Sequence, residues 1–338
     1  MNALVVRQDN NGDVLLIGPA VRAIAASASR LTFVCGPSGR AAAELLPGVD
    51  DVLSFEGAWI AANPHAVRRD HVNGFIDRIA RLRIDEAVIF TSFHQSPLPM
   101  ALLLRMAGVP RISAISEDYP GSLLDVRHRG VPDDIHEVER ALSLVRAAGF
   151  ALPPHDEGRL AMRVAPVNPL AHLRPYVIVH PGATVPARAW DPRANRDLVR
   201  ALAARGENVV VTGAESERAL CAYVAGEDAT NAAGTTDFRT LGRVIADAEA
   251  IVVGNTGAAH VAAAVGTPTV SLFPPTIPAV RFRPWMVRHV LLGDQEIACR
   301  GCRARSCPLV DQPCLGVVTV DDVLRALGTL RESHEVTV

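Results

Sequence analysis

The sequence predicts an α/β protein made of two doubly wound domains, each with a parallel sheet covered by helices on both faces. Short, nearly continuous apolar runs rich in β-branched residues alternate with Ala/Leu/Arg-rich segments of helical period. This series occurs twice along the 338 residues, and 49% of the residues are apolar, enough for two cores. Between the two series lies segment 152–175, which has five prolines and no clear period and is the predicted linker.

We therefore expect an N-terminal Rossmann-like domain at 1–165 and a C-terminal one at 172–338. The runs that predict strands are, in order, 3–7, 31–36, 51–55, 86–90, 176–182, 208–213, 250–255, 269–273 and 289–293. A final helix is expected at 319–333, with Thr319 as its N-cap and acidic residues in its first turn. Because ligands of such sheets bind at the carboxyl ends of strands, the loops after the strands are the candidate functional segments.

Composition and charge exclude several classes of function. The net charge of −2 argues against a nucleic-acid-binding protein, which would have a basic domain. The chain has no apolar run of 18 residues and no signal-peptide pattern at its start, so we expect a cytoplasmic protein with at most peripheral membrane contact. All 34 basic residues are Arg, so a cation that binds phosphate must be Arg or His.

The loop after the first strand is more polar than a turn requires. It reads Asn10, Asn11, Gly12 and Asp13 before the first helix. Asp13 is either the N-cap of that helix or a general base at the edge of a ligand site. Pro19 either opens a new helix or kinks the first one.

A second candidate site follows the strand at 250–255. Asn255, Thr256, Gly257 and Ala258 lead into a helix of small residues, whose N-terminus is a typical anion site. His260, one turn into that helix, is either a donor to a phosphate group or a histidine of the core.

Two further loops carry candidate donor-binding residues. In the segment 178–192, which also contains Thr184 and Trp190, Arg188 is either a diphosphate clamp or a solvated surface residue. After the strand at 208–213, Gly213 is followed by Glu215 and Glu217. One of these carboxylates is expected to hold a ribose hydroxyl, with Glu215 the first candidate, and the other to stabilise the start of a helix.

Five segments, 7–25, 96–111, 178–192, 209–220 and 254–273, occur in an order and at separations that resemble glycosyltransferase family 9, the ADP-heptose heptosyltransferases. The resemblance implies a GT-B fold, with two domains facing a cleft, the acceptor on the N-terminal domain and a nucleotide-sugar donor on the C-terminal one. It implies that Asp13 is the general base, that Arg188 contacts the donor phosphates, and that Thr256, Gly257 and His260 lie at the diphosphate and sugar. It also implies that catalysis needs no metal.

The chain departs from the family pattern at Asn255, where the resemblance implies Asp. The donor sugar is therefore heptose or a related sugar, and the acceptor an envelope glycan or a secondary metabolite. We expect an inverting, one-step displacement of the nucleoside diphosphate. Two alternatives stay open, another GT-B-like nucleotide-sugar enzyme of the epimerase type and an inactive nucleotide-sugar-binding or metal-binding protein.

Four cysteines lie close together near the C-terminus, with the spacing C-x2-C-x4-C-x6-C: Cys299, Cys302, Cys307 and Cys314. In a cytosolic protein such a group is typical of metal ligands, and a structural zinc site is one hypothesis. The alternatives are an iron–sulfur cluster, reduced thiols or disulfides. The two remaining cysteines, Cys35 and Cys221, are expected to be buried.

Overall fold

The computed structural model describes residues 1–61 and 64–332, and the chain divides into two compact units, Met1–Met162 and Arg163–Val338. The division falls inside the proline-rich segment 152–175. The first part of this segment is tied to the first unit, because Arg22 Nε and Nη2 donate to the Asp156 carboxylate at 2.6 and 2.8 Å.

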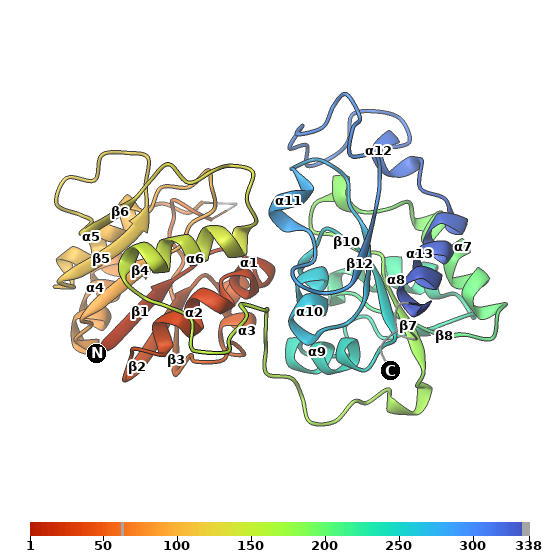
Figure 1. Ribbon diagram of the computed structural model, residues 1–338, viewed down its shortest axis with the longest axis horizontal. Coiled ribbons are helices and arrows are strands. Elements are labelled where there is room, and N and C mark those ends of the chain that lie inside the picture. Colours follow the sequence, from red (N-terminus) through yellow and green to blue (C-terminus); the bar gives the residue numbers. More distant parts are fainter. Residues whose placement is uncertain (62–63, 333–338) are drawn as a thin grey trace. The chain divides into compact units, whose positions relative to one another are not determined.

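The first unit is built on a six-stranded parallel sheet in the order β3-β2-β1-β4-β5-β6 (Figure 1). Its strands are β1 (Asn2–Val6), β2 (Arg30–Cys35), β3 (Asp51–Ser54), β4 (Glu86–Ile89), β5 (Arg111–Ile115) and β6 (Val126–His128). Its helices are α1 (Asn11–Leu16), α2 (Gly18–Ala25), α3 (Arg40–Ala43), α4 (Arg69–Leu82), α5 (Leu98–Met106) and α6 (Glu137–Ala148), with a 3-10 turn η1 (Pro37–Gly39). Helices α4 and α5 bury Phe75 and Met100 against Leu4 and Val6 of the central strand.

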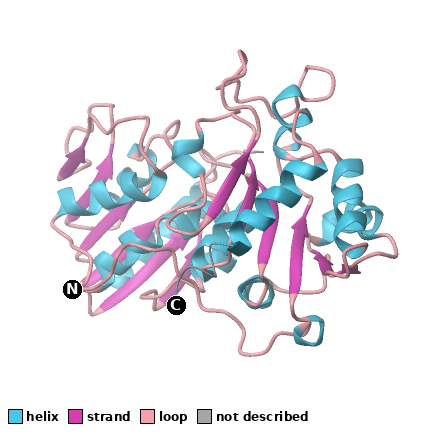
Figure 2. Ribbon diagram, turned by 45° about the vertical axis from the view of Figure 1, so that its right-hand side comes forward, coloured by secondary structure: helices cyan, strands magenta, loops and turns pink. Residues whose placement is uncertain are grey.

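The second unit repeats the architecture, with the sheet order β12-β11-β10-β7-β8-β9. Its strands are β7 (Tyr176–His180), β8 (Asn208–Val211), β9 (Thr230–Asn231), β10 (Ala250–Gly254), β11 (Thr269–Leu272) and β12 (His289–Leu292). Its helices are α7 (Pro192–Ala203), α8 (Arg218–Ala225), α9 (Phe238–Ala246), α10 (Gly257–Val265), α11 (Ala279–Phe282), α12 (Pro313–Gly316) and α13 (Val320–Glu332). Three 3-10 turns complete it, η2 (Ala171–Leu173), η3 (Pro186–Arg188) and η4 (Glu215–Glu217). In both units helices lie on both faces of the strands (Figure 2).

The two strand orders share one topological feature that decides where ligands can bind. In the first sheet the chain order reverses between β1 and β4, and in the second between β7 and β10. In doubly wound sheets the loops that leave the strands at such a switch point diverge and form the ligand crevice. The loops after β1 and β4, and those after β7 and β10, are therefore the places to look for a site in each unit.

The α/β class and the doubly wound domains are confirmed, and each predicted strand is present. Strands β5, β6 and β9 lie outside the predicted runs; β6 and β9 have only three and two residues, too few for an apolar run. The predicted cap of the last helix is confirmed: Thr319 Oγ1 accepts from the Asp322 N–H at 3.2 Å, and Asp322 Oδ2 accepts from the Thr319 N–H at 2.8 Å. No helix in the described ranges is both long and apolar enough to cross a bilayer.

The buried hydroxyl of Tyr176 gives a test of the second unit. The Tyr176 ring is 1% exposed; its Oη donates to Val244 O at 2.6 Å and accepts from Asn168 Nδ2 at 2.9 Å. We expect Tyr176→Phe to lower the free energy of unfolding by about 1–3 kcal/mol, because both partners lose their hydrogen bond in a buried place. Denaturant titration measures this. Tyr223→Phe, at a ring that is 45% exposed, is the control and should leave the transition in place.

Candidate active site

The loop after β1 forms a short helix that presents Asp13 in its first turn. Asn10 stands in the cap position of α1, so the alternative that Asp13 is the N-cap is wrong. The first helix ends at Leu16, and Pro19 lies in the first turn of α2, so this proline opens a new helix. The Asp13 side chain is 25% exposed, which leaves it accessible from the carboxyl edge of the sheet.

A buried arginine, Arg7, holds two carboxylates at this edge. Its Nε lies 2.6 Å from Asp9 Oδ2, its Nη2 lies 3.6 Å from Asp13 Oδ1, and Nη2 also donates to Ser92 Oγ, in the loop after β4, at 3.1 Å. Burial opposes the charge of Arg7, but Asp9, Asp13 and Glu137 attract it, and the net effect raises the pKa of its guanidinium. The arginine therefore stays charged beside Asp9 and Asp13. Sequence analysis missed Arg7, although a charged residue at the end of an apolar strand run was visible.

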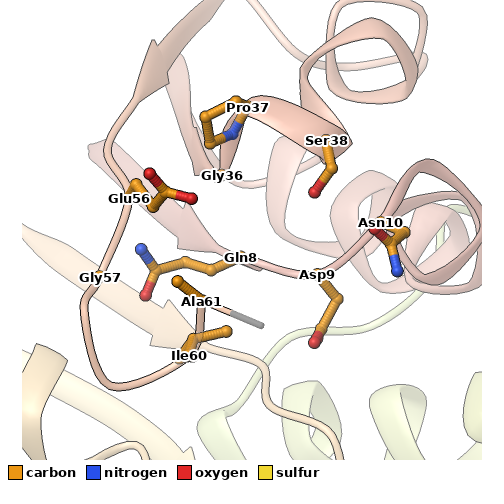
Figure 3. Close-up of a pocket in the computed structure, with 10 residues that line it drawn as sticks. All are labelled: Gln8, Asp9, Asn10, Gly36, Pro37, Ser38, Glu56, Gly57, Ile60 and Ala61. Atoms are coloured by element: carbon orange, nitrogen blue, oxygen red, sulfur yellow. The ribbon is translucent and has the colours of Figure 1, made fainter. Parts of the chain in front are cut away.

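A cavity of about 340 Å³ lies beside this loop (Figure 3). Its lining comes from the loops after β1, β2 and β3: Gln8, Asp9, Asn10, Gly36, Pro37, Ser38, Glu56, Gly57, Ile60 and Ala61. Of the three residues predicted beside Asp13, Asn10 lines the cavity. Asn11 makes a structural hydrogen bond instead, because its Oδ1 accepts from the Ala42 N–H at 3.0 Å. Gly12 is buried.

In the second unit the loop after β10 gathers the residues predicted to bind an anion. Thr256 caps α10, with its Oγ1 accepting from the Ala258 N–H at 3.2 Å, so part of the helix end is satisfied internally. His260 is 5% exposed and Asn255 is 4% exposed. The Asn255 Nδ2 atom is buried and has no hydrogen-bond partner among the described residues. A buried amide donor of this kind needs an acceptor, which a ligand oxygen would supply.

Arg188 lies next to this loop because of a glycine. A Cβ atom at Gly254, the last residue of β10, would lie 2.6 Å from Arg188 O, so only glycine allows the Arg188 turn to pack on the strand end. Arg188 is half-buried, and Thr184, earlier in the same loop, is exposed. Trp190 was predicted to contact the donor, but the structure places it in the hydrophobic core, 3% exposed, where it anchors the Arg188 loop.

The two predicted carboxylates after β8 have different surroundings. Glu215 is exposed and pairs with Arg218 at 2.7 Å. Glu217 turns inward: its carboxylate lies against Gly182, after β7, and near Gly213, and its Oε2 accepts from the Ala214 N–H at 2.8 Å. Glu217, which sequence analysis left second to Glu215, is thus the carboxylate at the strand ends. Burial lowers the pKa of the neighbouring His180, although Glu217 counteracts this.

Residues 94–311 match the family model described as glycosyltransferase family 9 (heptosyltransferase). The chain belongs to glycosyltransferase family 9. It is 29% identical over 328 residues to lipopolysaccharide heptosyltransferase 1 of Pseudomonas aeruginosa, covering 91% of this chain and 87% of that protein. It is 31% identical over 200 residues to lipopolysaccharide heptosyltransferase 3 of Escherichia coli, a match that spans 56% of each, little more than half of that relative.

Solved structures agree on the fold of this family-9 chain. The Escherichia coli ADP-heptose lipopolysaccharide heptosyltransferase II superposes with a TM-score of 0.75 at 20% identity, covering 99% of this chain and 100% of that one. Escherichia coli heptosyltransferase WaaC with ADP-2-deoxy-2-fluoro heptose gives 0.71 at 18% identity, covering 98% and 100%. The iron-containing dodecameric glycosyltransferase TibC from enterotoxigenic Escherichia coli gives 0.57 at 13% identity, covering 98% and 76%. The GT-B fold and the family resemblance are confirmed.

Among the four clustered cysteines of this family-9 chain, Cys299 and Cys307 lie close enough to Cys314 to affect its thiol. Burial raises the pKa of the Cys314 thiol, and the nearby Cys307 and Cys299 raise it further. Among the residues that the structure describes, no three His, Cys, Asp or Glu side chains are placed to hold a metal ion. The zinc hypothesis thus gains no support from the geometry and stays a prediction of the sequence.

The buried ion pairs of Arg7 give a testable prediction about the first unit. Arg7→Ala is expected to lower its free energy of unfolding by about 3–5 kcal/mol, because Asp9, 11% exposed, is left without its buried partner. Arg30→Ala removes an ion pair of the same 2.6 Å length whose side chains are 61% and 43% exposed, and should have little effect. Denaturant titrations of both variants measure the difference, and equal losses would contradict the role assigned to Arg7.

Alkylation and metal analysis together test the cysteines. Cys35 and Cys221 are buried, which raises the pKa of each to about 11, so neither should react with iodoacetamide at pH 8 in the folded protein. Cys302 is exposed and should react quickly if it is a free thiol. About one zinc or iron ion per chain, with Cys302 protected until a chelator is added, would support the metal site. Metal-free protein with a reactive Cys302 would contradict it.

Proposed function

We propose that this chain is an inverting glycosyltransferase that transfers heptose or a related sugar from a nucleoside-diphosphate sugar to an acceptor hydroxyl. ADP-heptose is the first candidate donor, because the relatives and solved structures reported above are named for heptose transfer. The acceptor class is a lipopolysaccharide-type envelope glycan or a hydroxylated secondary metabolite. In this proposal the residues of the chain carry out the transfer without a metal ion.

One observation in the second unit carries the donor part of the proposal. The Arg188 turn packs on Gly254, directly before Asn255 and the N-terminus of α10. A permanent positive charge, a buried amide donor and the positive end of a helix therefore occur at one switch point of the sheet. This combination fits the two phosphates and the sugar of a nucleoside-diphosphate sugar, and it fits poorly with a ligand that has no negative charge.

The carboxylate at the edge of the first sheet supplies the base in this proposal. Asp13 takes the proton of the acceptor hydroxyl while that oxygen attacks the anomeric carbon and the bond from this carbon to the phosphate oxygen breaks. The nucleoside diphosphate leaves with the electron pair, and Arg188 and the N-terminus of α10 stabilise its charge. A single displacement of this kind inverts the anomeric configuration. Arg7, whose Nη2 lies 3.6 Å from Asp13 Oδ1, assists by holding this carboxylate at the edge of the sheet.

Asn255 bears on which donor is used. An aspartate at this position could only accept hydrogen bonds, whereas the Asn255 amide nitrogen is a buried donor without a partner among the described residues. The proposed contact is therefore from this amide to an oxygen of the donor, either a sugar hydroxyl or a phosphate oxygen. The Asn255 amide can donate to either kind of oxygen, so this contact is compatible with heptose and with a related sugar that differs at the hydroxyl it meets.

A binding panel tests the donor. ADP, UDP, GDP and dTDP, with their heptose, hexose and deoxysugar conjugates, are compared by thermal shift and calorimetry. Stabilisation selective for ADP and ADP-heptose is expected. Selectivity for another base would overturn the ADP-heptose assignment while supporting glycosyl transfer, and no binding to any of these ligands would contradict the proposed function.

Two variants separate binding from chemistry. Asp13→Asn should bind the donor as tightly as the wild-type chain and lose sugar transfer by about 10²-fold or more, the typical contribution of a general base. Arg188→Ala should weaken donor binding, whereas Arg200→Ala, which removes an exposed arginine of α7, should not. Retained turnover in Asp13→Asn would exclude Asp13 as the base.

A further inference from the structure

The cysteine segment, which we define as residues 299–314, is bonded directly to the turn that carries Arg188. The Ala187 N–H donates to Arg305 O at 3.0 Å, and Gln312 Nε2 donates to Ala187 O at 2.7 Å. Ala187 is 2% exposed, so water does not compete for these two peptide groups. The residue that precedes Arg188 is thus held on both of its polar atoms by one distant segment.

The Gln312 contact fixes the orientation of Arg188 in particular. Ala187 O belongs to the planar peptide unit whose nitrogen is that of Arg188, so a hydrogen bond to this oxygen sets the plane from which Arg188 departs. Within the turn two short-range bonds form, from the Arg188 N–H to Val185 O and from the Ala189 N–H to Pro186 O. On its other side Arg188 O rests on Gly254. Gln312 and Gly254 together leave the turn little freedom.

Gln312 is itself held in an unusual conformation. Its φ is 44° and that of Asp311 is 58°, so two successive residues other than glycine are left-handed. The backbone around them closes tightly: Gln312 O accepts from the N–H groups of Leu315 and Gly316, both at 2.9 Å. Backbone strain of this kind persists where the surrounding structure requires one geometry, and here that geometry brings the Gln312 amide to Ala187.

The other end of the cysteine segment is bonded to the loop after β11. The Gly301 N–H donates to Pro275 O at 2.7 Å, and the Arg303 N–H donates to Thr276 O at 3.0 Å. The segment therefore connects the loops that follow β7 and β11, the two strands that flank β10 in the sheet. We propose that Gln312 is a positioning residue that orients Arg188 for the donor diphosphate, and that the cysteine segment is the support that holds Gln312 in place. This inference rests on the proposed function.

Calorimetric binding of ADP to the full chain tests the proposal. Gln312→Ala is expected to weaken ADP binding about fivefold to tenfold, the effect of losing one good hydrogen bond. Gln312→Glu keeps the length of the side chain but turns a carboxylate oxygen toward Ala187 O. This variant should therefore bind ADP at least as weakly as Gln312→Ala. Gln312→Gly, which tolerates φ 44°, gives the same test if the alanine variant does not fold.

A double-mutant comparison distinguishes positioning from a general loss of stability. If Gln312 acts through Arg188, Arg188→Ala with Gln312→Ala binds ADP within about twofold of Arg188→Ala alone. Asn208→Ala is the matched control, because its amide donates to Leu173 O and Pro175 O at the amino end of β8; ADP binding should not change. Wild-type-like binding by Gln312→Ala, or additive losses, would overturn this inference alone. A wild-type chain that binds no nucleoside diphosphate would overturn the proposed function with it.

Discussion

The parallel alignment of each sheet is the constraint on which the rest of the structure depends. Because all strands of a sheet point the same way, the loops that follow the strands gather at the carboxyl edge, where ligands of such sheets bind. Both candidate sites obey this rule. Arg7 and Asp13 follow β1, and Arg188 and Asn255 follow β7 and β10. These strands lie at the switch points of the two sheets.

Close packing at these edges fixes the functional groups more than local propensity does. A side chain at Gly254 would clash with Arg188 O, and the Glu217 carboxylate lies against Gly182. Trp190, buried in the core, then fixes the far side of the Arg188 loop. Such contacts confine a loop whose own hydrogen bonds are few, and a confined arginine loses less conformational entropy when an anion binds.

The sequence was sufficient for the architecture and for the positions of the main loops, but not for which side chains meet. Hydrophobic periodicity identified the long strands, and the cap at Thr319 followed from its residue type. Glu215 and Glu217 differ by two positions in one 3-10 turn, and only the fold decides which of them faces Gly182. Arg7 meets Ser92 only through the register of β1 and β4, and the Gln312 contact joins residues 125 positions apart. Neither leaves a signal in a local pattern.

The two sheets share one topology but have different charged groups at their carboxyl edges. This difference fits the proposed reaction, in which the base and the donor-binding groups belong to different units. At the edge of the first sheet two carboxylates share one buried arginine, so the acidic groups outnumber the charge that balances them. At the edge of the second sheet an arginine, a neutral amide and a helix N-terminus adjoin, and the Glu217 carboxylate lies at the ends of β7 and β8. The carboxylates at the first edge suit the removal of a proton from a hydroxyl and repel a diphosphate. The arginine and the helix N-terminus at the second edge attract a diphosphate. In the proposed transfer, this distribution of charge assigns the acceptor hydroxyl to the first unit and the diphosphate to the second.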